Sequence, residues 1–152
     1  MKKLVLINPH PIGNVGEENV SVLNQMPVNL GYLKVLTPKH WQVDIIDETQ
    51  ELAVDENTGD ITFGGADLVG ITSVSYQAHR AYQIATACRK QGIPVIMGGI
   101  HATSYPEEAA KYVDCVVTRE AVTTWEKIIG DFEKGCLQKR YDGVLTPMEL
   151  YQ

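Results

Sequence analysis

Five short runs of apolar residues recur along the chain, and they restrict its fold more than any other feature of the sequence. Short continuous apolar runs, closed by polar or turn-forming residues, are typical of strands buried on both faces of a parallel sheet. The runs are residues 3–8 (KLVLIN), 42–47 (QVDIID), 68–73 (LVGITS), 94–97 (PVIM) and 114–118 (DCVVT). We therefore expect five buried parallel strands.

The segments between these runs carry helical signals, apart from the acidic and ambiguous stretch 48–66. The expected helices cover residues 26–37, 78–88, 106–112 and 125–132, where apolar or small residues recur at helical spacing. Strands that alternate with helices predict a parallel sheet covered on both faces, and right-handed crossovers leave few possible strand orders. We predict a flavodoxin-like (Rossmann-like) three-layer α/β sandwich with a five-stranded parallel sheet of order 2-1-3-4-5.

The expected domain covers residues 1–135. The remaining residues, 136–152 (CLQKRYDGVLTPMELYQ), lack a further strand–helix unit. We interpret this C-terminal tail as an edge strand, or as a linker toward a domain that the sequence does not contain.

Composition and charge exclude several classes of function. The formal net charge of -6 disfavours nucleic acid as a partner, because counterion release needs clustered Lys and Arg. The first apolar run ends too early for a signal peptide, and no apolar stretch is long enough to cross a membrane, so we expect a cytoplasmic protein. The spacing of the three cysteines matches no zinc, haem or iron–sulfur motif. Cys88 and Cys115 lie in apolar runs, which is typical of core residues.

Ligands of open parallel sheets bind at the carboxyl ends of the strands, where the strand order reverses. The candidate binding residues on these loops are Asn8, His10 and Gly13 after the first strand, Thr72, Ser73, Val74, Ser75 and Gln77 after the third, Gly98, Gly99 and His101 after the fourth, and Arg119 and Glu120 after the fifth. Hydroxyls and glycines dominate this set. Glycine-rich phosphate motifs are absent, and no Ser–His–Asp set stands out. The loops therefore suit a bulky, largely neutral ligand that is bound through hydroxyls and the backbone.

The chain resembles the N-terminal cobalamin-binding domain of radical S-adenosylmethionine enzymes. The pieces that carry the resemblance are LVLINPH (4–10), PVNLGYLKVL (27–36), VDIIDE (43–48), DLVGITSVSYQAHRAYQIA (67–85), GIPVIMGGIHATSYPEEA (92–109) and VDCVVTREAVTTWEKIIGDFEKG (113–135). They cover nearly the whole chain in the right order, and G-G-x-H followed by P-E-E-A is the most specific.

The resemblance implies a cobalamin whose nucleotide tail lies between the sheet and its helices, with the corrin over the strand ends. Thr72-Ser73-Val74 falls where the family commonly carries a Ser-x-Leu that binds the tail. Gly98-Gly99 falls at the family's Gly-Gly, and a branched side chain at Gly99 is expected to fill space meant for the tail. Tyr76 and Tyr105 either line the corrin or cover the surface, and His101 either binds the tail or caps the following helix.

The sequence departs from the family at two sites near the expected ligand. Relatives often carry Gly-Glu-Gly-Glu after the fifth strand, where this chain has Arg119-Glu120-Ala121-Val122. Residues 8–13 (NPHPIG) nearly match D-x-H-x-x-G, the motif whose His is the lower cobalt ligand in other cobalamin proteins. Because Asn8 replaces the Asp that would orient the imidazole, we expect that cobalt takes no protein ligand, with His10 as the alternative.

We interpret the chain as the cobalamin-binding module of a radical enzyme, a methyltransferase or cyclase, that is not catalytic alone. Its partners are then cobalamin and the radical domain of the same parent chain, with neither nucleic acid nor membrane. The iron–sulfur cluster and S-adenosylmethionine belong to the part of the parent that the sequence lacks. The alternative is a flavodoxin-like regulatory or binding module that no longer binds cobalamin, and the missing Gly-Glu-Gly-Glu supports it.

Overall fold

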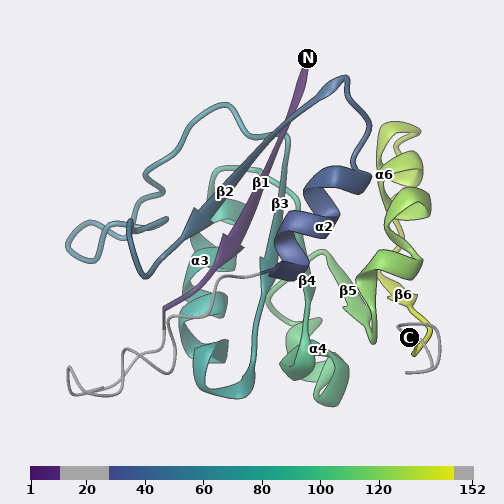
Figure 1. Ribbon diagram of the computed structural model, residues 1–152. Helices are drawn as coiled ribbons and strands as arrows, with labels where there is room; N and C mark the ends of the chain where they lie inside the picture. The colour runs from purple at the N-terminus through teal and green to yellow at the C-terminus, as the bar shows by residue number, and fades with distance from the viewer. Residues whose placement is uncertain (11–27, 146–152) are drawn as a thin grey trace.

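The apolar runs form the strands of a twisted parallel sheet in the computed structural model, which describes residues 1–10 and 28–145 (Figure 1). The five predicted strands are β1 (Lys2–Asn8), β2 (Trp41–Asp47), β3 (Leu68–Thr72), β4 (Val95–Gly98) and β5 (Cys115–Thr118). They lie in the order β2-β1-β3-β4-β5, and all neighbours are parallel. The predicted three-layer fold and strand order are therefore confirmed.

A sixth strand, β6 (Arg140–Asp142), extends the sheet beyond β5 and is parallel to it. The expected number of five strands is therefore one too low, and the start of the 136–152 segment is an edge strand. Only its middle residue, Tyr141, is buried. The Tyr141 hydroxyl donates to Asp131 Oδ2 at 2.7 Å. A strand with one buried residue leaves no apolar run in the sequence, which is why an edge strand was one of two alternatives here and was not counted among the five strands.

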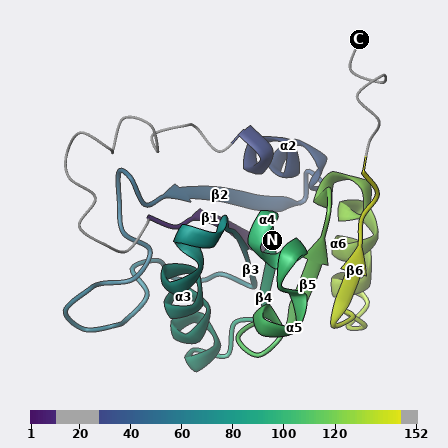
Figure 2. The ribbon, with the colours of Figure 1, turned by 90° about the horizontal axis from the view of Figure 1, so that it is seen from below.

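Helices cover both faces of the sheet (Figure 2). The helices and 3-10 turns are α2 (Val28–Leu36), η2 (Ser75–Gln77), α3 (Ala78–Lys90), α4 (Ile100–Ser104), α5 (Pro106–Ala109), η3 (Ala121–Thr123) and α6 (Trp125–Glu133). Helices α2 and α6 pack on one face, and α3, α4 and α5 pack on the other. No helix in the described residues is long and apolar enough to span a membrane.

Alternation along β1 explains why residues 4–7 are all apolar. In β1, Leu4 and Leu6 pack in the cluster with α2 and α6, whereas Val5 and Ile7 pack in the cluster with α3. All four side chains are fully buried. A strand that is buried on both faces cannot alternate polar with apolar residues, so the run is continuous.

The helix expected over 106–112 is shorter, and α4 precedes it. Tyr105 separates the two helices with φ -131° and ψ 59°. The residue before a proline disfavours helical backbone, because the proline ring collides with it, and this breaks the helix at Pro106.

The acidic segment 48–66 is fixed to the sheet by a buried ion pair. Arg80 of α3 donates from Nε to Glu48 Oε1 at 2.9 Å and from Nη2 to Glu48 Oε2 at 2.8 Å. The backbone N–H of Ala53 also donates to Glu48, and the carbonyl of Val54 accepts from Arg80. Both charged side chains are almost fully buried. This network anchors the loop after β2 beside the carboxyl end of β1.

Candidate functional site

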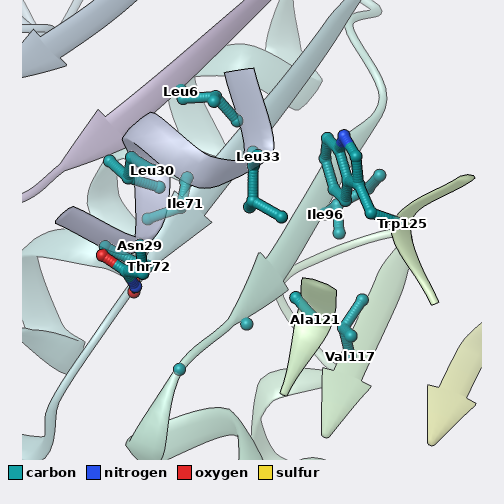
Figure 3. A pocket seen from close by; sticks show the side chains of 13 residues that line it. Leu6, Asn29, Leu30, Leu33, Ile71, Thr72, Ile96, Val117, Ala121 and Trp125 are labelled. Atoms are coloured by element: carbon teal, nitrogen blue, oxygen red, sulfur yellow. The ribbon is translucent and has the colours of Figure 1, made fainter. Parts of the chain in front are cut away.

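A pocket lies between the sheet and helix α2, and its polar end is at the carboxyl ends of β3 and β4 (Figure 3). It is lined by Leu6, Asn29, Leu30, Leu33, Gly70, Ile71, Thr72, Ile96, Gly98, Gly99, Val117, Ala121 and Trp125. Most of these residues are apolar, and Asn29 and Thr72 are the polar side chains among them. The empty volume is about 380 Å³ when the open mouth is included. The lining therefore suits an apolar group with a polar attachment at the mouth.

Gly98 and Gly99 have different structural reasons to be glycine. A Cβ at Gly98 would meet the backbone oxygen of Val117 at 3.7 Å, which is an ordinary contact. A Cβ at Gly99 would lie 2.7 Å from the Ser73 carbonyl oxygen and 2.9 Å from Thr72 Oγ1, and its φ is +99°. The neighbouring backbone therefore gives Gly99 a structural reason to be glycine. Gly99 also lines the pocket, and its role in making room for a ligand stays a prediction. A Cβ is therefore compatible with the surrounding backbone at Gly98 but not at Gly99.

Of the two adjacent hydroxyls after β3, only Thr72 belongs to the pocket. Thr72 Oγ1 accepts from Asn29 Nδ2 of α2 at 3.3 Å. The Ser73 side chain is buried and donates to the Val74 carbonyl at 2.8 Å. Thr72 is thus placed for ligand contact, while the hydroxyl of Ser73 serves its own loop.

Asn8 and Gln77 connect the loops after β1 and β3. Gln77 Nε2 donates to Asn8 Oδ1 at 3.1 Å and to the Pro9 carbonyl at 2.7 Å. Gln77 Oε1 accepts from the backbone N–H of half-buried Val74 at 3.0 Å, and Asn8 Nδ2 donates to Asp47 at 3.3 Å. Both side chains are buried. They hold the two loops of the expected crevice together.

His10 lies beside the 48–66 segment. Its Nε2 is 3.3 Å from Glu56 Oε1, and its backbone N–H donates to the buried Glu48 at 3.4 Å. A carboxylate therefore does approach this imidazole, but from Glu56 and not from position 8. Gly13, the other candidate in this loop, lies outside the described residues.

His101 sits on the opposite side of β4 from the pocket and is not one of its lining residues. Its Nδ1 is 3.2 Å from Ser75 Oγ, and its Nε2 is 3.1 Å from both Tyr82 Oη and Glu108 Oε1. It caps neither α4 nor α5 through its side chain. Hydrogen bonds from Tyr82 and His101 hold the pKa of Glu108 below its usual range. Ser75 of η2, His101 of α4 and Glu108 of α5 thus form a row of polar contacts that the sequence did not reveal.

The loop after β5 closes against the C-terminal segment. Arg119 is exposed with φ +60°, and its N–H donates to Thr103 Oγ1 at 2.8 Å. Gly143 comes so close that a Cβ there would lie 2.5 Å from the carbonyl oxygen of half-buried Glu120. Neither Arg119 nor Glu120 lines the pocket.

Sequence reasoning missed the apolar walls of the pocket. Leu30 and Leu33 of α2 recur at helical spacing and are buried, and they also line the pocket. Trp125 was expected in the core and is, with its Nε1 donating to Thr37 at 2.9 Å. Periodicity marks an apolar face but cannot separate side chains that fill a core from those that leave a gap. Within the described residues, no group of three or more His, Cys, Asp or Glu could hold a metal ion.

The fold is a doubly wound α/β domain with a pocket between the sheet and α2. The chain belongs to the B12 binding domain family, whose model matches residues 20–129. It is 38% identical over 136 residues to the bacteriochlorophyllide d C-8(2)-methyltransferase of Chlorobaculum tepidum, covering 83% of this chain and 29% of that protein. It is 31% identical over 151 residues to the C-12(1)-methyltransferase of the same organism, covering 97% and 31%. The chain thus spans less than a third of the length of these relatives.

The residues present fit a cobalamin tail in chemistry, and partly in size. The base of the tail is flat and aromatic, which matches the walls formed by Leu30, Leu33 and Trp125. The space open to the centre of a water molecule is only about 40 Å³, which holds a few waters. A base beneath α2 therefore requires this helix to move away from the sheet.

Proposed function

We propose that this chain binds cobalamin as the cofactor module of a radical S-adenosylmethionine enzyme, a methyltransferase or cyclase. The observation that carries the proposal is the apolar pocket beneath α2, with its hydroxyl and glycine mouth at the carboxyl ends of β3 and β4. The position agrees with the reversal of strand order beside β1 and β3. Family membership supports the ligand, and the names of the two relatives support methyl transfer by the parent.

In this proposal the chain supplies binding and orientation. Leu30, Leu33 and Trp125 enclose the base of the tail and exclude water from it. Thr72 and Asn29 supply polar atoms at the mouth. When bound, the cofactor supplies a cobalt centre that can carry a methyl group, and the domain itself catalyses no step.

The polar network beside the pocket would fix the loops on which the corrin rests. Gln77 ties the chain after β1 to the chain after β3, and both partners are buried. Buried and fully bonded side chains resist displacement, since breaking them leaves unpaired polar groups. The chain at Pro9 and Val74 is therefore held in place before a ligand arrives, which would lower the entropy cost of binding.

We further propose that residues 1–135 together with β6 form the binding domain. Residues after β6 would then lead to the radical domain, which would carry the iron–sulfur cluster and S-adenosylmethionine. We place the protein in the cytosol, where its free cysteines stay reduced.

Titration of the 152-residue chain with hydroxocobalamin tests the proposed function. We expect saturable binding, a visible spectrum of the base-off form, and a raised thermal midpoint, because a ligand that binds only the folded state stabilises it. If neither the visible spectrum nor the thermal midpoint changes at millimolar cobalamin, the proposal that the chain is a cobalamin-binding module fails. The chain is then the regulatory module that Arg119-Glu120-Ala121-Val122 favours.

We propose that cobalt takes no ligand from His10. Its Nε2 is 3.3 Å from Glu56, and ligation through that atom would require the imidazole to leave this carboxylate. Electron paramagnetic resonance of the cob(II)alamin complex is expected to show no splitting from a protein nitrogen, and His10→Ala should leave the spectrum unchanged. A nitrogen splitting that disappears in His10→Ala would establish His10 as the lower ligand.

A further inference from the structure

A chain of hydrogen bonds connects an exposed hydroxyl near the candidate site with a carboxylate on α5. Ser75 is exposed in the loop after β3, three residues beyond the pocket residue Thr72. Its Oγ is 3.2 Å from Nδ1 of His101, whose side chain is only 8% exposed. His101 Nε2 in turn lies 3.1 Å from Oε1 of Glu108.

The partners of Nε2 determine where the proton of the neutral imidazole resides. Glu108 accepts the Tyr82 hydroxyl proton at 2.8 Å, so Tyr82 offers only oxygen lone pairs to the imidazole. An ionised carboxylate has no proton to give. Because both neighbours of Nε2 are acceptors, Nε2 carries the proton and Nδ1 is an acceptor. The one proton of Ser75 then points inward to Nδ1.

A hydroxyl whose proton is directed inward presents only lone pairs to a ligand. We propose that Ser75 accepts a hydrogen bond from a carboxamide N–H on the corrin periphery, and that His101 and Glu108 are positioning residues that keep Ser75 an acceptor. This inference rests on the proposed function. It adds a specificity: the domain prefers a corrinoid with intact carboxamides to one in which an amide has become a carboxylate. A carboxylate has no N–H to donate and brings negative charge to the lone pairs of Ser75.

The tautomer of His101 is measurable without any ligand. Imidazole ¹⁵N chemical shifts of the 152-residue chain at neutral pH are expected to show a protonated Nε2 and an unprotonated Nδ1. Glu108→Gln replaces an obligate acceptor by an amide that can also donate, so the preference for this tautomer weakens. Glu107→Gln, an exposed neighbour with the same change of charge, should leave the shifts unchanged. An Nδ1-protonated neutral imidazole in the unaltered chain would overturn the proposal.

Specificity is tested with hydroxocobalamin and its monocarboxylic acids, each of which carries one carboxylate in place of a peripheral carboxamide. We expect the unaltered chain to bind at least one acid isomer about tenfold more weakly than the parent compound, the usual scale for a lost polar contact. In Ser75→Ala and Glu108→Gln this ratio should fall to about threefold or less, whereas Glu107→Gln retains it. Both test positions are on the surface, and the thermal midpoint reports whether each variant folds.

The outcomes separate this inference from the proposed function. If the unaltered chain does not bind hydroxocobalamin, both the proposed function and this inference are refuted. Normal binding with equal affinity for all the acid isomers, or with a ratio that Ser75→Ala leaves unchanged, removes the inference and leaves the cobalamin module intact.

Discussion

Replacement of Gly98 by valine should fill the pocket beneath α2 while leaving the sheet intact. A Cβ at this position makes only an ordinary contact with Val117, and a branched side chain suits a strand. The valine methyl groups would then compete with the base of the tail. A base that buries about 120 Å² of apolar surface at about 25 cal/mol per Å² gains about 3 kcal/mol. We therefore expect Gly98→Val to weaken cobalamin binding about 150-fold, with little change in the free energy of unfolding.

Isothermal titration with hydroxocobalamin and urea unfolding measure the two quantities separately. Gly99→Ala is the matched variant: its Cβ would collide with the Ser73 backbone at positive φ, so it should lower stability by about 2 kcal/mol. Unchanged affinity in a folded Gly98→Val variant would refute the placement of the tail beneath α2. If the valine variant unfolds, Gly98→Ala, which adds only the Cβ, carries the same test at smaller amplitude.

Three further predictions concern other parts of the molecule. Glu48→Gln should lower the free energy of unfolding by about 3 kcal/mol in urea titrations, because it leaves the buried Arg80 charge without its counter-ion; a loss below about 1 kcal/mol would contradict this. Cobalamin should shift the amide resonances of α2 far more than those at the C-terminal end of α3, since only α2 must move to admit the base, and equal shifts would argue against that movement. Burial raises the pKa of the Cys88 and Cys115 thiols to about 12, so at pH 8 they stay protonated and iodoacetamide should modify only the exposed Cys136 until urea is added; rapid triple modification of the native chain would contradict their burial.

The sheet could be predicted because its strands are buried on both faces. Leu4, Val5, Leu6 and Ile7 are all fully buried, and no other arrangement hides such a run so simply. An edge strand in residues 136–152 was only one of two alternatives, because β6 buries only Tyr141. A strand at the edge of the sheet pairs with one neighbouring strand and is only partly covered by helices. It therefore needs few apolar residues, and an apolar run in the sequence does not mark it.

The candidate site could be predicted only to the level of its loops. Strand ends and topology place Thr72 and Gly98 at the carboxyl edge of the sheet, where both line the pocket, because the order of the strands fixes that edge. Which of two adjacent hydroxyls faces the pocket depends on backbone direction after the strand, and Ser73 turns inward. His101 contacts Tyr82 of α3 and Glu108 of α5, and no local sequence pattern predicts contacts between residues on different helices.

In the proposed complex, the carboxyl edge of the sheet would divide affinity from selectivity. On the α2 side the pocket is almost entirely apolar, and apolar burial is strong but does not discriminate among flat bases of similar size. On the α3 side the Ser75 hydroxyl lies against the buried His101 imidazole, which contacts Glu108 in turn, and a fixed acceptor would reject a ligand that lacks the matching donor. Because Ser75, His101 and Glu108 do not line the pocket beneath α2, a substitution in one set should leave the contribution of the other intact. Gly98→Val and Ser75→Ala should accordingly combine additively in binding free energy, and strong coupling between them would mean that the two faces respond to the ligand as one unit.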